Sequence, residues 1–301
     1  MQSILVIFID GVGIGKEDYE YNPFFKYGFK AFSEIFGSIP SQENQVLNKN
    51  GAYIFPTDAR LGVEGLPQSG TGQTSIFCGI NASKYVGKHF GPYPYSTLIP
   101  VIKEKNLFAY YKNLGKKVFF ANAYPKIFFD YINSGRSRLS VTSLSCTLSG
   151  LRLNTSTDVR KGKALTAEIT NDRWNKKLGY RLRVIKPATA ARRLMRIARQ
   201  NTYTLFEYFL TDHLGHGRYE GTAESLLKIL DEFLFTLITE LDNENMTLLV
   251  CSDHGNLEDL SVKTHTLNPS LTITSGKFAR ELFNEIKDIS QIKQGITKYI
   301  K

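Results

Sequence analysis

Short apolar runs alternate along the chain with longer segments whose apolar residues recur at helical spacing. Residues 3–9 form a continuous apolar run rich in β-branched residues, which is typical of a strand buried on both faces. Residues 117–123, 203–210 and 246–251 have the same character. Strands that alternate with helices predict βαβ units and a mainly parallel sheet covered on both faces.

The helices are predicted from residues that favour a helix start and from the helical spacing of apolar residues. Asn22-Pro23 is a sound helix start, because Asn is a good N-cap and Pro suits the first helical position, and this helix should run to about Phe36. Residues 220–241 and 285–300 predict two more helices. Residues 126–186 break the rhythm, so we expect one α/β domain over 1–301 with either a small cap or a long polar insertion there.

Composition narrows the class of protein. The 301 residues are 42% hydrophobic and 22% charged, which is ordinary for a globular protein. Three cysteines without CxxC spacing favour neither a disulfide framework nor a thiolate metal site, so we expect a reduced, cytoplasmic protein. The first apolar run reads as a strand rather than a signal peptide, and no apolar stretch approaches the ~20 residues that span a membrane.

The formal net charge of +10 favours anionic partners. We expect a small phosphorylated molecule and no membrane. Nucleic acid stays open as a partner, although no nucleic-acid-binding motif accompanies the basic residues. The sequence does not indicate an oligomeric state.

Four of the five histidines fall in two short clusters with aspartates, in the last third of the chain. The first cluster contains Asp212, His213 and His216, and the second contains Asp253 and His254, followed by His265. His213 breaks the DxxxH spacing, so it is expected either beside the ligands or partly exposed, rather than among the ligands. Taken singly, each Asp or His is as well explained by a turn or a helix cap.

Both clusters follow apolar strands, and Asp10 ends the first strand. Open α/β sheets bind ligands at the carboxyl ends of their strands, so three strands should deliver aspartates to one edge. Carboxylates and imidazoles are the ligand set for Zn²⁺, Mn²⁺ and similar ions. Several carboxylates without a cation would repel one another strongly. The combination therefore predicts a metal centre.

Residues 65–79 add a hydroxyl-rich segment, with Ser69-Gly70-Thr71-Gly72 opening a helix through Ile76 and Phe77. A hydroxyl at a helix N-terminus can attack phosphorus while free N–H groups hold phosphate oxygens. The alternative is that Ser69 is only an N-cap. The segment is neither a Walker A loop nor a Rossmann fingerprint.

Together these motifs resemble the alkaline phosphatase superfamily, nearest the branch of cofactor-independent phosphoglycerate mutase and phosphopentomutase. The resemblance is carried, in the family's order, by Ile9-Asp10-Gly11, Ser69-Gly-Thr-Gly, Asp212-xxx-His216, Asp253-His254-Gly255-Asn256 and Thr264-His265-Thr266-Leu267-Asn268-Pro269. It implies a three-layer α/β/α sandwich with two divalent metal ions, Zn or Mn first and Mg as an alternative.

The resemblance also implies roles for residues. Asp10, Ser69, Asp253 and His254 would hold one metal, and Asp212, His216 and His265 the other. Ser69 would be the nucleophile that becomes phosphorylated, with Thr71 as the alternative. Gly70, Asn81 and His89 are the candidates for substrate contacts.

The mutases carry large caps, whereas here residues 69–212 must also supply core elements, so any cap is small. The leading hypothesis is therefore a metal-dependent phosphomonoesterase that acts on a small phosphorylated metabolite. The alternatives are a phosphodiesterase or nuclease at the same site, a phosphomutase, and a non-catalytic metal-bearing binding module.

Overall fold

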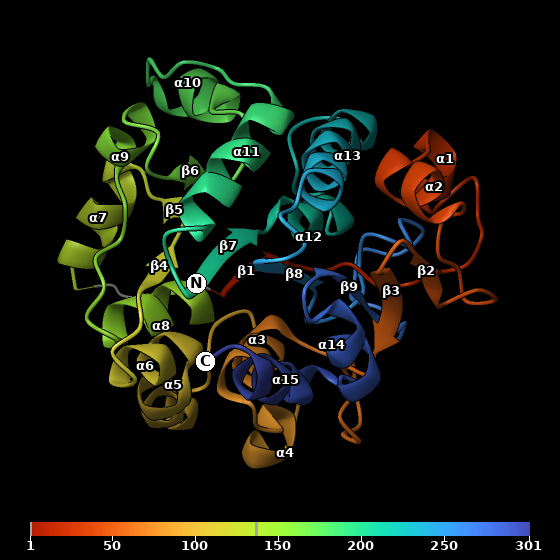
Figure 1. Cartoon of the computed structure of the whole chain (residues 1–301), viewed down its shortest axis with the longest axis horizontal. Coiled ribbons are helices and arrows are strands. Elements are labelled where there is room, and N and C mark those ends of the chain that lie inside the picture. The colour runs from red at the N-terminus through yellow and green to blue at the C-terminus, as the bar shows by residue number, and fades with distance from the viewer. Residues whose placement is uncertain (1, 136–137) are drawn as a thin grey trace.

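The computed structural model describes residues 2–135 and 138–301, and a seven-stranded sheet crosses its centre (Figure 1). The strand order is β2-β3-β9-β8-β1-β7-β4. Strands β8, β1, β7 and β4 are mutually parallel, while β9 runs antiparallel to both β8 and β3, and β2 antiparallel to β3. The strands are β1 (Ser3–Ile9), β2 (Leu47–Lys49), β3 (Ala52–Thr57), β4 (Val118–Phe120), β7 (Tyr203–Tyr208), β8 (Met246–Cys251) and β9 (Ser270–Gly276).

Strand β1 lies in the middle of the sheet and is buried along its whole length. Because successive side chains of a strand point to opposite faces, Leu5, Ile7 and Ile9 enter one apolar core and Ile4, Val6 and Phe8 the other. The helices of the first face are α1 (Pro23–Tyr27), α2 (Lys30–Phe36), α11 (Pro187–Ala198) and α13 (Ala223–Thr239).

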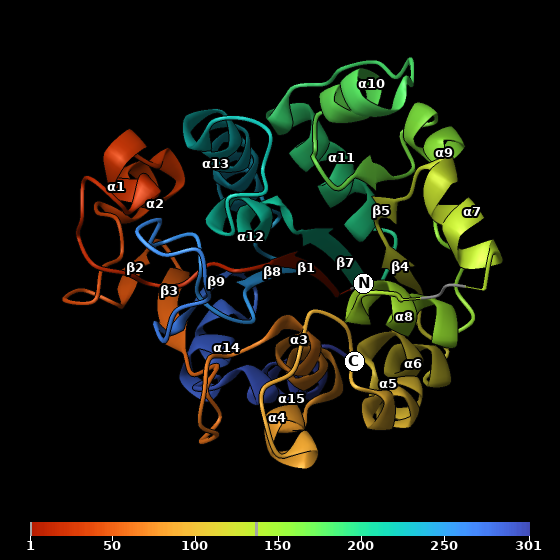
Figure 2. The same ribbon diagram turned by 180° about the vertical axis from the view of Figure 1, so that it is seen from behind.

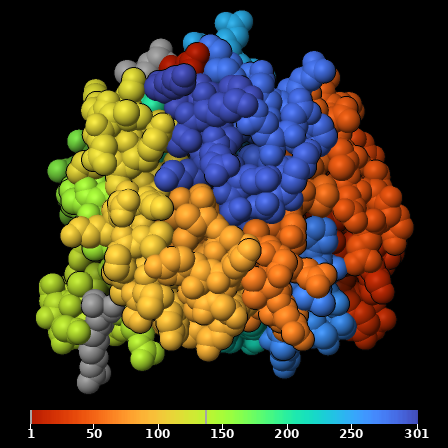
Figure 3. All heavy atoms as spheres, turned by 90° about the horizontal axis from the view of Figure 1, so that it is seen from below, coloured from red at the N-terminus to blue at the C-terminus, as the bar shows by residue number. Residues whose placement is uncertain are grey.

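More helices cover the second face of the sheet. They lie below the sheet in Figure 1, and Figure 3 shows this layer from below as a continuous covering. They are α3 (Ser69–Cys78), α5 (Ile99–Lys105), α6 (Leu107–Asn113), α8 (Val141–Leu148), α14 (Ala279–Glu285) and α15 (Ile292–Tyr299). Short elements α4 (Ala82–Val86), η1 (Ser96–Leu98) and η2 (Ile289–Gln291) connect them. The architecture is the predicted three-layer α/β/α sandwich with a mostly parallel sheet, which confirms the fold class.

Several predicted boundaries need correction. The helix expected from Asn22 to Phe36 is two helices, because Gly28 has φ +75° and turns the chain between them. The Asn22 side chain does accept a hydrogen bond from the Phe24 N–H, as an N-cap should. Residues 117–123 form two short strands in different sheets, β4 and β5 (Asn122–Ala123). The closing helix begins only at Ile292.

Residues 126–186 are neither a featureless excursion nor one separate unit. Helix α8 packs against α3, α5 and α6 in the main layer. The other elements lie together beyond the β4 edge of the sheet, as Figures 1 and 2 both show. These are α7 (Lys126–Asn133), α9 (Ser156–Arg160), β6 (Leu165–Thr166), which pairs with β5, and α10 (Asp172–Leu178). A small core around Trp174 and Val159 holds α9 and α10 together.

Among residues 2–135 and 138–301, the structure contains no helix with both the length and the apolar character needed to cross a bilayer.

Leu230, at the centre of α13, is buried in the first core, so its truncation tests this packing. We expect Leu230→Ala to lower the free energy of unfolding by about 2–5 kcal/mol, through lost burial and an unfilled cavity. Lys228→Ala, on the exposed side of the same helix, should change it by less than about 0.5 kcal/mol. Urea denaturation of both variants makes the measurement, and equal stabilities would contradict the assignment of Leu230 to the core.

Candidate metal centre

Three aspartates meet at the carboxyl ends of three adjacent strands. Asp10 directly follows β1, Asp253 follows β8, and Asp212 lies in α12 (Leu210–Gly215), the short helix after β7. Because β8, β1 and β7 are neighbours and parallel, their ends meet at one edge of the sheet. All three carboxylates are buried, and Asp253 is completely inaccessible at 0% exposure.

Two histidines converge on Asp212. The Asp212 Oδ1 atom lies 3.2 Å from His216 Nε2 and 3.4 Å from His265 Nε2, and the two Nε2 atoms are 3.1 Å apart. His265 reaches this place because β9 is antiparallel, so the segment that enters β9 lies at the same edge. The Nδ1 atoms of both rings point at backbone carbonyls, His216 at Lys263 (2.8 Å) and His265 at Pro67 (2.6 Å), which fixes each ring with Nε2 toward Asp212.

The second group surrounds His254. Its Nε2 atom lies 3.4 Å from Asp10 Oδ1, 3.5 Å from Asp253 Oδ2 and 3.1 Å from the Ser69 hydroxyl oxygen. One possible ligand atom from each of Asp10, Asp212 and His254 also lies within 4.8 Å of the others. The structure thus brings all seven residues predicted as metal ligands to one place, in two adjoining groups with Asp212 between them.

Ser69 is the first residue of α3, and the N-cap position is occupied by Gln68. Its hydroxyl therefore faces His254 rather than capping its own helix. The approach of α3 requires small residues: a Cβ atom on Gly72 would lie 2.9 Å from the Asp253 Cβ, and one on Gly70 2.1 Å from the Tyr93 carbonyl oxygen. Gly70, predicted as a substrate contact, is thus also a packing residue.

The alternative nucleophile, Thr71, is engaged elsewhere. Its hydroxyl donates to the Gln68 carbonyl (3.2 Å) and accepts from the Phe90 N–H (3.1 Å), and the residue is fully buried. Geometry therefore favours Ser69.

Asn81 and His89, the other predicted substrate contacts, are not brought to the site. Asn81 caps α4 through the Lys84 N–H and donates to the Leu61 carbonyl. His89 is paired with the Ser83 hydroxyl (3.0 Å) and faces the Val63 carbonyl (3.2 Å). Both residues hold loops in place, because sequence proximity to Ser69 does not amount to proximity in space.

The electrostatics of the cluster are dominated by burial. Burial, together with the negative charges of Asp253 and Asp212, raises the pKa of Asp10 well above its ordinary value. Burial and the charge of Asp212 raise the pKa of Asp253 to about 7. Burial and the neighbouring His265 lower the pKa of His254 to about 3. Burial also acts on Asp212, but hydrogen bonds from His265 and Asn256 outweigh it and hold the Asp212 pKa below its usual range.

These residues fit a divalent cation. Asp10 Oδ1 and Asp253 Oδ2 are buried without a hydrogen-bond partner among the residues that the structure describes. Both atoms lie within 3.5 Å of His254 Nε2, so they point at a shared position. Unpaired buried carboxylate oxygens are costly, and a cation bound between carboxylates and neutral imidazoles removes that cost.

Glu258, which the sequence analysis did not single out, connects the loops that carry the ligands. Its Oε2 atom accepts from the N–H groups of Gly13 and Asn256, both at 2.8 Å. Its Oε1 atom accepts from the Thr266 hydroxyl (2.5 Å) and the Asn268 amide (3.0 Å). The loop after Asp10, the loop after Asp253 and the segment around His265 thus share one buried carboxylate.

Glycines make room for this carboxylate. A Cβ atom would lie 2.6 Å from Glu258 Oε1 at Gly13, and closer still at Gly255. At Gly15 it would lie 2.8 Å from the Glu258 Cγ atom. Nothing in the sequence around Glu258 signals this role, because its partners come from three separate segments.

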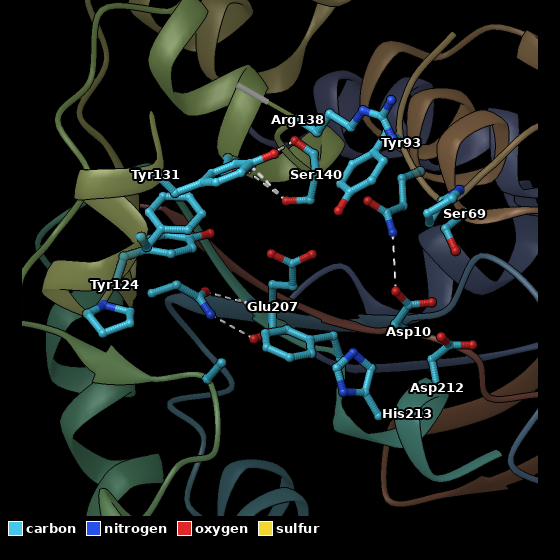
Figure 4. A pocket seen from close by; sticks show the side chains of 18 of the residues that line it. Asp10, Ser69, Tyr93, Tyr124, Tyr131, Arg138, Ser140, Glu207, Asp212 and His213 are labelled. Atoms are coloured by element: carbon cyan, nitrogen blue, oxygen red, sulfur yellow. Dashed lines mark hydrogen bonds between the residues drawn. The ribbon is translucent and has the colours of Figure 1, made fainter. Parts of the chain in front are cut away.

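A cavity of about 580 Å³ opens beside the centre, and Asp10, Ser69, Asp212 and His213 line its metal side (Figure 4). Gln73 contributes to the same side and donates from its amide to Asp10 Oδ2 at 3.4 Å. Glu207 lies between this side and an opposite aromatic side, and its carboxylate accepts from the Thr142 hydroxyl at 2.6 Å. Burial raises the pKa of Glu207 to about 7. Its signal in the sequence was an acid inside an otherwise apolar strand.

Part of the chain that carries these residues is similar to a known family. Residues 184–301, which contain five of the seven predicted ligands, match a family model described as the Metalloenzyme superfamily. A search of curated proteins found no match.

Solved structures share the fold at low sequence identity. The PH0037 protein from Pyrococcus horikoshii superposes with a TM-score of 0.54 at 12% identity, covering 93% of this chain and 86% of that one. The C-terminal periplasmic domain of EcEptC from Escherichia coli, in a complex with Zn, has a TM-score of 0.52 at 9% identity, covering 100% and 83%. A cold-active alkaline phosphatase from Shewanella sp. has a TM-score of 0.51 at 11% identity, covering 99% and 100%.

Glu258→Gln should weaken metal binding, because an amide cannot accept from all four donors and its own NH₂ group would face two of them. We expect the affinity for Zn²⁺ or Mn²⁺ to fall by about 10–100-fold, as for other residues that orient ligands. Competition with a chromophoric chelator measures this. Asp259→Asn, at the partly exposed neighbouring carboxylate, is the matched control and should bind like the wild type. An unchanged affinity in Glu258→Gln would contradict the positioning role.

The metal-free protein should lose stability as the pH rises from about 4 to about 7. Asp253 and Glu207 have folded-state pKa values of about 7, above their ordinary values, and that of Asp10 is also raised. The folded state then binds more protons than the unfolded state in this range, and the stabilisation is lost as the groups ionise. The lowered pKa values of His254, His89 and His213 oppose the trend, but with Glu168 and Asp231 the carboxyl groups of raised pKa outnumber them.

Urea denaturation in the presence of a chelator, repeated across this pH range, measures the loss. Added Zn²⁺ or Mn²⁺ should abolish it by stabilising the ionised carboxylates. A metal-free protein whose stability rises steadily over the same range would contradict the electrostatic description.

Proposed function

We propose that this protein is a metal-dependent phosphoric-ester hydrolase of the phosphomonoesterase type, which acts on a small phosphorylated molecule through a phosphoserine at Ser69. The observation that carries the proposal is the position of the Ser69 hydroxyl. It lies at the start of α3, 3.1 Å from His254 Nε2, inside a buried cluster of carboxylates and imidazoles. An alcohol side chain in such a cluster is suited to nucleophilic attack.

We propose two divalent ions, Zn²⁺ or Mn²⁺ with Mg²⁺ as the alternative, in the two groups of ligands. Asp10, Ser69, Asp253 and His254 would hold one ion, and Asp212, His216 and His265 the other. Such a pair lowers the pKa of an adjacent hydroxyl and neutralises the charge that develops on a phosphoryl group. The structural neighbours share only the fold with this chain, but one of them is an alkaline phosphatase and another was crystallised with Zn, which is consistent with this chemistry.

In this proposal some residues of the chain bind the phosphoryl group and Ser69 attacks it. The N–H groups at the start of α3, apart from that of Thr71, which donates to the Phe90 carbonyl, and the positive end of the helix dipole favour the negatively charged phosphoryl oxygens. The guanidinium of Arg218, 3.8 Å from Asp212 Oδ2, lines the cavity beside them. The Ser69 oxygen attacks phosphorus in line with the departing ester oxygen, and water later attacks the phosphoserine to release phosphate.

The test is turnover of p-nitrophenyl phosphate with added Mn²⁺ or Zn²⁺. We expect Ser69→Ala to lower kcat by at least about a thousandfold, because the nucleophile acts as a unit with its activating groups. Acid quenching of the wild type followed by mass spectrometry should locate phosphate on the Ser69 peptide. Bis-p-nitrophenyl phosphate serves as the comparison substrate and should react more slowly.

Activity that survives both EDTA and Ser69→Ala would refute the proposal. A preference for the diester would instead favour a phosphodiesterase at the same site.

A further inference from the structure

The cavity beside the metal centre is much larger than a phosphate group needs, and its far side is aromatic. In Figure 4 the side chains of Tyr124 and Tyr131 lie across the cavity from Asp10 and Ser69. Tyr124 stacks on Phe128, with ring centroids 4.1 Å apart and an interplanar angle of 25°. Trp174 and Phe209 also line the cavity. Its volume of about 580 Å³ lies within the range of small-molecule sites.

Large apolar side chains at the mouth of this cavity are exposed. Ile127 is 65% exposed, Tyr93 39% and Tyr131 38%. Ile127 and Tyr131 belong to α7, a helix whose residues 126–133 are all described and none of which is buried, so they contribute little to the core. Tyr93 comes from a different segment, on the side of α3. Exposed apolar side chains that gather from separate segments around one opening indicate a ligand.

Several of the polar side chains that line the cavity are already hydrogen-bonded to neighbouring residues. Asn122 donates to the Glu207 carbonyl and accepts from the Glu207 N–H, both at 2.8 Å. The Ser140 hydroxyl is paired with those of Thr142 and Ser143, each at 2.9 Å. A sugar or polyol in this part of the cavity would have to find partners for several hydroxyls among groups that are already bonded.

We propose that the organic group of the substrate is flat and apolar, so that the protein prefers phosphate esters of aryl alcohols. The proposal rests on the function proposed above and adds the substrate class. The phosphoryl group lies next to Ser69 and Arg218, and the ring enters between Tyr131, Ile127 and Tyr93. The Ser69 Oγ–P bond forms as the aryl O–P bond breaks, and the proton that the Ser69 hydroxyl loses is balanced by the one that the aryl oxygen takes up. Water then cleaves the phosphoserine, which releases phosphate and restores the Ser69 hydroxyl.

Binding of two phosphonates tests the proposal without turnover, because their C–P bond is not an ester. Phenylphosphonate should bind the metal-loaded protein about tenfold more tightly than methylphosphonate, since only its ring reaches the aromatic side. Trp174 is the single tryptophan of the chain and lines the cavity, so its fluorescence reports binding.

Variants on α7 connect the preference to the proposed wall. Ile127→Ala and Tyr131→Ala should each lower the affinity for phenylphosphonate by about three- to tenfold and leave that for methylphosphonate unchanged. Asp130→Ala, on the same helix but not lining the cavity, is the matched control and should behave as the wild type.

Equal affinities for the two phosphonates, no binding of either, or variants without effect would overturn the proposal. The two proposals fail separately. A protein that hydrolyses no phosphate ester but prefers phenylphosphonate contradicts the proposed function alone. A protein that hydrolyses p-nitrophenyl phosphate but does not distinguish the phosphonates contradicts the substrate class alone.

Discussion

The repulsion between three buried carboxylates is the constraint on which the rest of the site depends. Asp10, Asp212 and Asp253 are delivered by adjacent parallel strands, so the sheet itself forces them together. Without a cation, burial and mutual repulsion raise the pKa values of Asp10 and Asp253, while hydrogen bonds hold the Asp212 pKa below its usual range. Repulsion between these carboxylates favours separation of the loops that carry them. Here the carboxylate of Glu258 ties the loops after Asp10 and Asp253 to the segment around His265, and the Asn256 amide donates to Asp212.

The fold was predictable where burial alone determines structure. Strands β1 and β8 begin and end where the apolar runs do, because a strand covered on both faces has few polar positions. The predicted helix over 22–36 was wrong at Gly28, since both halves are rich in phenylalanine and only the backbone reveals the turn. For residues 126–186 the sequence left a small cap and a polar insertion open, because the core that α9 and α10 share there is small.

The candidate site was predictable for those residues whose place in the fold follows from the sequence around them. An aspartate at the end of a strand must lie at the sheet edge, so Asp10 and Asp253 could be placed from the sequence. Glu258 could not, because what defines it is the set of partners that folding supplies, and Glu207 was marked only as an acid within a mostly apolar strand. For the same reason the sequence did not show that His89, although close to Ser69 in sequence, holds a loop in place away from the site.

In helix α7 the side chains that line the cavity contribute little to stability, unlike the side chains of the metal centre. Around Ser69 and Glu258 nearly every side chain both stabilises the fold and serves the proposed chemistry. A substitution there therefore alters stability and reactivity together. Helix α7 packs against the second core through Phe128, Phe129 and Ile132, whereas Ile127 and Tyr131 belong to none of the apolar cores and Ile127 is mostly exposed. Mutational drift can therefore reshape the entrance at little cost to folding, and related chains with the same centre are free to diverge in the molecules they admit.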